Sequence, residues 1–233
     1  MVTHHHVIGH KLFDEDPNLI SRTLRRAGFD FPDLIHVERL STADSVEHEA
    51  DLLLRVKTSD GRLALVVFEI QHRADSNKPK SWGRVGMKLY YKYQLPVVFV
   101  VVATNEPCER WADECFDFGM GMGDMLAIRP LVVGPSSVRA IADVAEARAD
   151  PMYAALSVVA HRDHPDIQTM LEAAIQALVE LDDPTWDIIA KFIDIMVNVT
   201  LPAGLWAKLM EEQRPRLQGP TCQRCIADDV LDS

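Results

Sequence analysis

The chain has 233 residues, 48% of them hydrophobic, which is enough apolar material to bury a full-sized globular core. Acidic residues outnumber basic ones and set the formal net charge at -11, so the averaged field repels nucleic acid and anionic membranes, and a site for a polyanion has to be local. No apolar run approaches the roughly 20 residues that cross a bilayer, and four cysteines without a leader sequence predict the cytoplasm, where thiols stay reduced.

The first part of the chain predicts strands and helices in a mixed order. In chain order we expect a helix from Asp16-Pro17 to Gly28, strands at 34–40, 51–57 and 62–72, a helix at 80–93, and strands at 97–103 and 126–133. Capping residues bound the first helix, and the other elements follow from apolar periodicity. Residues 59–61, Ser-Asp-Gly, are typical of a hairpin turn.

Strand signals almost vanish after Gly134-Pro135. Segments that begin near residues 136, 151, 166 and 184 are rich in alanine and leucine at helical spacing. We therefore expect three parts, which are an α/β core over 1–135, a helical region over 136–217 and a disordered tail over 218–233. The helical region is expected either to pack on the core or to mediate self-association as a homo-oligomer.

The strand at 62–72 carries two polar residues within an apolar run. Side chains alternate across a strand, so Glu69 and Gln71 point to the same face. Residues 63–68, which precede Glu69, carry no charge, and such a run is typical of a strand buried on both faces. An ionised carboxylate in that setting needs a charged partner or a metal ion.

The hairpin register provides a partner for Glu69. If the loop at 59–61 has three residues with its glycine left-handed, Thr58 pairs with Arg62, and Asp51 lies opposite Glu69. Opposed carboxylates repel unless a cation lies between them, so the pair predicts a site for a hard ion such as Mg²⁺. In the structural alternative, Asp51 caps its strand and Glu69 pairs with an arginine.

The segment that follows is strongly basic, with six basic residues and one acid between Arg73 and Lys92. The candidates for nucleic-acid contacts are Lys78, Lys80, Arg84, Lys88 and Lys92. The last four recur every four residues and form one stripe on a helix, which suits a phosphate backbone or is simply a solvated face. Aromatic residues in the same segment, suited to stacking on a base or to core packing, are Trp82, Tyr90, Tyr91 and Tyr93.

In this order and spacing, the residues resemble the PD-(D/E)XK nuclease superfamily, and more narrowly its putative-transposase and recombination-promoting-nuclease branch. The resemblance covers about residues 15 to 135. It is carried by the basic helix and by three short runs, which are Glu49-Ala50-Asp51-Leu52-Leu53-Leu54, Phe68-Glu69-Ile70-Gln71-His72, and the strand 97–103 with Thr104-Asn105.

The resemblance implies a restriction-endonuclease-like mixed sheet flanked by helices, with a helical C-terminal extension. It also implies that Asp51 and Glu69 bind Mg²⁺ or Mn²⁺ and, with Gln71, form the catalytic set of a metal-dependent DNA endonuclease of the transposase-associated kind. Gln71 stands where the family usually has a lysine, and glutamine orients a water without supplying charge. Lys78, Lys80 or Lys88 is the candidate substitute.

The alternative function is a catalytically silent nuclease-fold module that acts in nucleic-acid or protein binding.

Two further pairs of residues have no assigned role. Glu47 and Glu49 precede Asp51 and are either an additional metal ligand or solvated. Cys222 and Cys225 form a CxxC, but a structural zinc site needs four ligands and no second pair lies nearby.

Overall fold

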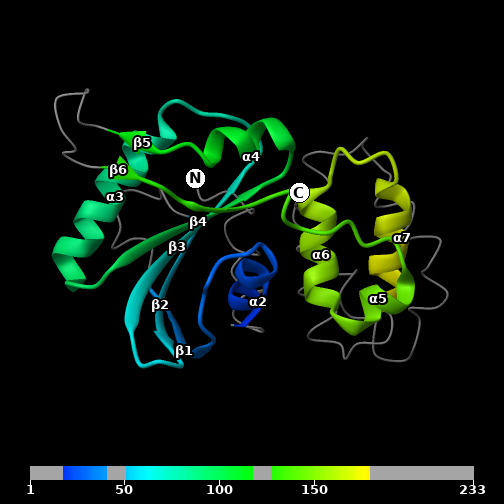
Figure 1. The fold of residues 1–233 in the computed structure, drawn as a ribbon, viewed down its shortest axis with the longest axis horizontal. Coiled ribbons are helices and arrows are strands. Elements are labelled where there is room, and N and C mark those ends of the chain that lie inside the picture. The colour runs from blue at the N-terminus through cyan, green and yellow to red at the C-terminus, as the bar shows by residue number, and fades with distance from the viewer. Residues whose placement is uncertain (1–17, 41–50, 118–126, 179–233) are drawn as a thin grey trace, which may run out of the picture.

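The computed structural model describes residues 18–40, 51–117 and 127–178, which form a five-stranded mixed sheet with helices on both faces (Figure 1). The helices are α2 (Asn18–Arg26), α3 (Lys78–Tyr93), α4 (Glu106–Ala112), α5 (Val144–Ala149), α6 (Pro151–Ala160) and α7 (Ile167–Leu178). The sheet strands are β1 (Leu34–Arg39), β2 (Leu52–Thr58), β3 (Leu63–Gln71), β4 (Val97–Ala103) and β7 (Leu131–Val133). Two short strands, β5 (Phe116–Asp117) and β6 (Ala127–Ile128), pair separately.

The sheet has the order β1-β2-β3-β4-β7 and puts β3 at its centre. The first three strands are antiparallel neighbours, whereas β3, β4 and β7 run parallel. A parallel connection needs a crossover, and α3 provides the one between β3 and β4. Because β3 and β4 run parallel, their carboxyl ends meet at the same edge of the sheet.

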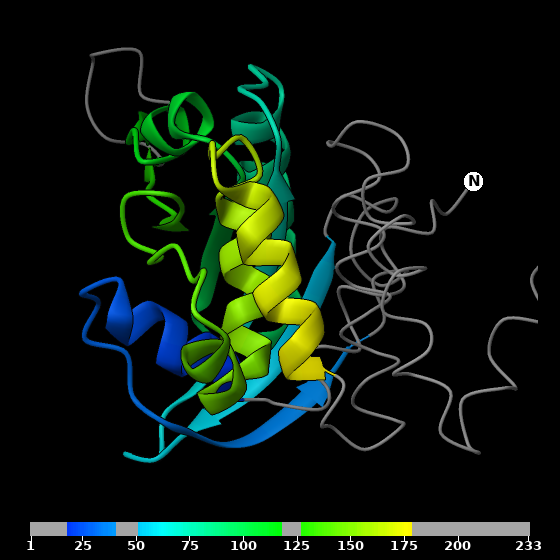
Figure 2. The ribbon, with the colours of Figure 1, turned by 90° about the vertical axis from the view of Figure 1, so that its right-hand side faces the viewer.

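Two hydrophobic clusters cover the two faces of the sheet. On one, called the α3 face here, Leu53, Val67 and Val101 pack with Trp82 and Leu89 of α3. Residues of the opposite parity, such as Leu54, Val66 and Phe68 in the same strands, pack on the other face with α2, α5, α6 and α7. Figure 2 shows α6 and α7 in front of the sheet.

The helical region after β7 belongs to the second cluster. Tyr153 and Leu156 of α6 are buried with the sheet residues of that face. Arg22 and Arg26 of α2 both form ion pairs with Asp150, at 3.2 Å and 3.0 Å, and the Arg26 guanidinium lies 4.0 Å from the centroid of the Tyr153 ring. Side-chain contacts therefore join α2 and α6 across a large sequence separation.

The predicted elements up to β4 are confirmed, with small differences at their ends. Helix α3 begins two residues earlier than expected, at Lys78, since Pro79 sits in the first turn, where its missing N–H removes no helical hydrogen bond. Gly28 ends α2 with φ of 88°. The predicted start at Asp16-Pro17 lies outside the described residues.

Other predicted elements differ more. The strand expected at 126–133 is divided into β6 and β7 by Arg129-Pro130, because proline has no N–H to give to a ladder. The helix expected from residue 136 begins at Val144, after Asp143 caps its first turn. Helix α4 was not predicted. The helix expected from residue 184 and the tail at 218–233 lie outside the described residues.

In the parts of the chain that the structure describes, no helix combines the length and the apolar character that crossing a membrane requires.

Candidate functional site

The hairpin between β2 and β3 has the predicted register. The Thr58 amide donates to the Arg62 carbonyl at 2.9 Å, and Gly61 is left-handed with φ of 86°. Leu52 then pairs with Phe68. The same register, continued by one residue, sets Asp51 opposite Glu69, as the turn chemistry predicted.

Glu69 is buried at the carboxyl end of the central strand, with 1% of its surface exposed. Its Oε2 atom accepts hydrogen bonds from the Lys78 ammonium at 2.7 Å and from the Gln71 side-chain amide at 3.0 Å. The contact with Gln71 confirms that the two side chains share a face. Oε1 is also buried and has no hydrogen-bond partner among the described residues, so half of this carboxylate is unsatisfied.

The pKa of Glu69 is raised to about 7, because burial and then the negative charge of Asp51 raise it more than Lys78 and Gln71 lower it. Burial acts this way because a low-dielectric interior disfavours the charged form. The carboxyl group therefore changes its protonation state near neutral pH. Titration in that range is common at functional sites and also occurs in structural ion pairs.

Asp51 lies just before β2 and is partly buried. Its Oδ2 accepts a hydrogen bond from the Ile70 amide at 2.8 Å, across the β2-β3 pair. This bond fixes the carboxylate beside the end of β3, where its charge acts on Glu69. The sequence left open that Glu69 pairs with an arginine. In the structure, the cation that contacts Glu69 is Lys78.

Lys78 reaches Glu69 because the connection from β3 to α3 is short. Residues 72–77 turn the chain back over the α3 face, and the Asp75 carbonyl accepts from the Lys78 amide at 3.1 Å. The first residue of α3 is thereby placed above the end of β3, and its side chain is only 27% exposed. Sequence reasoning named Lys78 as one of three substitutes for the motif lysine, without selecting among them.

A second layer of hydrogen bonds joins the ends of β3 and β4. The Asn105 side chain donates to the His72 carbonyl at 2.9 Å and accepts from the Cys108 amide, as the N-cap of α4. His72 Nδ1 lies 3.2 Å from the Thr104 hydroxyl. These residues fix the backbone next to Gln71, whose carbonyl also accepts from the Thr104 amide. The sequence motifs included Gln71, His72 and the Thr104-Asn105 pair, but they did not connect Cys108 with these residues.

The four-residue stripe lies on the exposed surface of α3, and its members are Lys80, Arg84, Lys88 and Lys92. Of the basic residues selected from the sequence, only Lys78 contacts Glu69 in the described structure. The aromatic residues of the segment differ in their exposure. Trp82 is fully buried in the α3-face cluster, whereas Tyr90 and Tyr91 are exposed.

The donor set at this edge suits a hard divalent cation. Asp51 and Glu69 provide carboxylate oxygens, and Glu69 Oε1 is buried with no hydrogen-bond partner in the part of the chain that the structure describes. The described residues contain no group of three or more His, Cys, Asp and Glu that could hold a metal. Two carboxylates are nonetheless sufficient for Mg²⁺, which commonly keeps several waters and takes the rest of its ligands from substrate phosphate. Glu47 and Glu49 lie outside the described residues, as do Cys222 and Cys225.

A cavity of about 770 Å³ lies at the other end of the same strands. Its walls include Leu63 at the start of β3, Val97 and Phe99 at the start of β4, and Met87 and Tyr90 of α3. Within the described structure, Glu69 and the three residues that act on its carboxylate are not part of this lining; the three are Asp51, Gln71 and Lys78. The charged site and the apolar cavity are therefore separate features of the sheet.

A scan against protein-family models and searches of curated proteins and of solved structures find no match to this chain.

Proposed function

We propose that the protein is a metal-dependent nuclease that hydrolyses phosphodiester bonds in DNA. We place its sheet in the restriction-endonuclease-like class and its chemistry in the transposase-associated branch of the PD-(D/E)XK superfamily. One observation carries the proposal. A buried glutamate lies opposite an aspartate that directly precedes the neighbouring strand, and one of its oxygens is bound to a lysine and a glutamine while the other has no partner among the described residues.

The position of the site in the fold supports the proposal. In sheets with parallel strands, functional residues gather outside the carboxyl ends of the strands, and Glu69 lies near that end of β3, paired with Val101 of the parallel strand β4. The crossover helix α3 then begins directly above the site. A basic surface is thereby placed beside two acids in a chain whose overall charge is strongly negative.

Each residue has a distinct role in the proposed reaction. Asp51 and Glu69 would hold the divalent ion, which when bound polarises the scissile phosphate and lowers the pKa of a bound water. Gln71 orients the attacking water through its side-chain amide. Lys78 supplies the positive charge that Gln71 lacks and stabilises the negative charge that develops on the phosphate oxygens. Glu69 binds the ion in its ionised form, and its pKa is raised to about 7, so cleavage should increase with pH as the ion displaces the proton from Glu69.

The direct test measures cleavage of supercoiled plasmid with Mg²⁺ or Mn²⁺ by the wild type and by Asp51→Ala and Glu69→Ala. We expect nicking that depends on the metal and that both substitutions abolish. Glu38→Gln is the matched control, because Glu38 is an exposed acid on β1 that pairs with Arg55. Equal nicking by all four proteins would identify a contaminant and overturn the proposal.

A catalytically silent module is the second candidate, and the contact between Lys78 and Glu69 favours it. An ammonium group at 2.7 Å already neutralises the carboxylate, and Gln71 occupies the position of the usual lysine. In this reading the fold binds nucleic acid or protein without turnover. Binding of DNA with no cleavage in either metal over pH 6 to 9, a range that includes the Glu69 pKa of about 7, would support it.

A further inference from the structure

Two tyrosines on α3 are exposed to an extent unusual for large aromatic side chains. Tyr91 is 82% exposed and Tyr90 is 52% exposed. The other two aromatic residues of the helix pack against the protein, since Trp82 is fully buried and Tyr93 is partly buried against the α3-face cluster. Aromatic rings contribute most when they bury their apolar area, so two uncovered rings on one helix indicate a surface that receives a partner.

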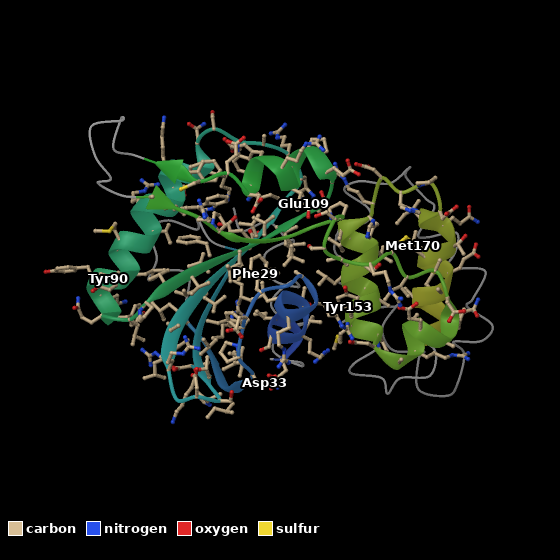
Figure 3. The ribbon with its side chains drawn as sticks, in the orientation of Figure 1. Phe29, Asp33, Tyr90, Glu109, Tyr153 and Met170 are labelled. Carbon is tan, nitrogen blue, oxygen red and sulfur yellow. The ribbon has the colours of Figure 1, made fainter. Side chains whose placement is uncertain are left out.

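Tyr91 lies within the basic stripe. It follows Lys88 by three residues and Arg84 by seven, which places all three on the same side of the helix. Lys80 lies at the start of the stripe, and the side chains of Lys80 and Lys88 are both exposed. Figure 3 shows Tyr90, the neighbour of Tyr91, on α3 at the end of the molecule opposite α7. The outer surface of α3 thus combines cationic groups with an uncovered ring.

This combination fits a single strand better than a duplex. Single-strand sites pair a cationic track for the phosphates with aromatic rings on which bases stack. In a duplex the faces of the bases are already stacked on each other, so Tyr91 would have only a sugar or a phosphate to contact. We propose that the outer surface of α3 binds single-stranded nucleic acid, with phosphates along the basic stripe and a base stacked on Tyr91.

The geometry links this surface to the Glu69 site. Lys78 and Tyr91 are thirteen residues apart on one helix, which is about 20 Å along its axis. That length corresponds to about six nucleotides at 3.4 Å per stacked step. At about 100° per residue the two side chains face different sides of the helix. A strand whose reacting phosphate lies beside Lys78 would therefore pass around the first turn of α3 and then follow the basic stripe to Tyr91 in the last turn. This inference rests on the proposed function, because it takes nucleic acid as the partner and adds the form in which it is bound.

The test measures binding with EDTA present, so that cleavage plays no part. Fluorescence anisotropy compares a labelled oligothymidylate with a duplex of the same length. We expect the wild type to bind the single strand more tightly, and Tyr91→Ala to weaken that binding about ten-fold. Tyr91→Phe keeps the ring and should bind within about two-fold of the wild type, and the duplex affinity should change by less than about two-fold in both variants.

Two further variants serve as controls. Ile35→Ala removes a different exposed apolar side chain, on β1, and should change neither affinity. Lys88→Ala should weaken single strand and duplex alike and reduce the salt dependence of both. The inference is overturned if the duplex binds at least as tightly as the single strand, if neither binds, or if Tyr91→Ala changes single-strand affinity by less than about two-fold.

The outcome is distinguishable from that of the nuclease test. If the protein binds single-stranded DNA through Tyr91 but cleaves no DNA in either metal, this inference stands and the proposed nuclease function is overturned. If cleavage depends on metal and on Glu69 but Tyr91→Ala does not change binding, the nuclease function stands and this inference is overturned.

Discussion

Two buried glutamates, Glu69 on β3 and Glu109 on α4, show how differently one side chain can be accommodated. Glu109 has both oxygens satisfied, because Oε2 accepts from the Ser136 amide at 3.0 Å and Oε1 from the Ser136 hydroxyl at 2.7 Å. Figure 3 shows Glu109 on α4. Glu69 instead has a neighbouring acid, a raised pKa and one oxygen that no described residue satisfies.

Burial of Glu109 is compensated by its hydrogen bonds, whereas burial of Glu69 costs free energy. Gly134 lies so close to Glu109 that a Cβ there would come within 2.6 Å of the Glu109 carboxyl carbon. The chain after β7 is therefore shaped around a satisfied carboxylate. At Glu69 an unsatisfied buried oxygen costs free energy of about 1–3 kcal/mol or more, and binding of an ion would offset that cost.

The largest expected effect is on catalysis. Glu69→Gln removes the ionisable group but keeps the size of the side chain, and we expect metal-dependent cleavage to fall by at least about 100-fold. Glu109→Gln should leave the activity per folded molecule within about two-fold, since Glu109 takes no part in the proposed reaction. Plasmid cleavage normalised to the folded fraction measures both. Equal losses in the two variants would mean that Glu69 is structural.

The next effect is on the pH dependence of stability. The pKa of Glu69 rises from an ordinary value of 4.5 to about 7 on folding, so below 4.5 its contribution to stability is fully present. As the pH rises through 7 that contribution is lost, because ionisation becomes costly only in the folded protein. The loss is about 3–4 kcal/mol, at about 1.4 kcal/mol for each pH unit between the two pKa values.

Urea denaturation of wild type and Glu69→Gln at several pH values checks this prediction. Stability of the wild type should fall more steeply between those pH values than stability of the variant. Parallel curves for the two proteins would show that burial of Glu69 does not carry the effect.

A smaller effect is expected on the stability that Glu109 provides. Glu109→Gln converts a carboxylate acceptor into an amide and leaves either the Ser136 amide or its hydroxyl poorly matched. We expect the free energy of unfolding to fall by about 1–2 kcal/mol at neutral pH. Chemical denaturation measures this change. An unchanged stability would mean that Ser136 finds other partners.

The smallest effect is stabilisation by the metal itself. Mg²⁺ or Mn²⁺ at ten times its dissociation constant should stabilise the folded protein by about 1.4 kcal/mol. The shift in melting temperature should be larger at pH 8 than at pH 6, because the ion competes with the proton on Glu69. Glu69→Gln should abolish the shift and Glu109→Gln should keep it. A shift of equal size in both variants would place the metal elsewhere.

Local sequence chemistry was sufficient for much of the fold and for the pair of acids. The turn residues at 59–61 fix the hairpin register, and the two-residue period of a strand then assigns each side chain to a face. Asp51 opposite Glu69, and Gln71 on the same face as Glu69, follow from these two rules. By contrast, helix α4 is only seven residues long, so it shows too few turns of apolar periodicity to be recognised.

What the sequence by itself determined is therefore the placement of groups that a single hairpin relates, since that relation depends only on backbone geometry over about twenty neighbouring residues. Tertiary structure alone decided that Lys78 rather than an arginine contacts Glu69, and that Glu109 is buried against Ser136. Both contacts depend on how a helix packs on the sheet, and packing is set by the summed contacts of whole faces, which no local pattern encodes.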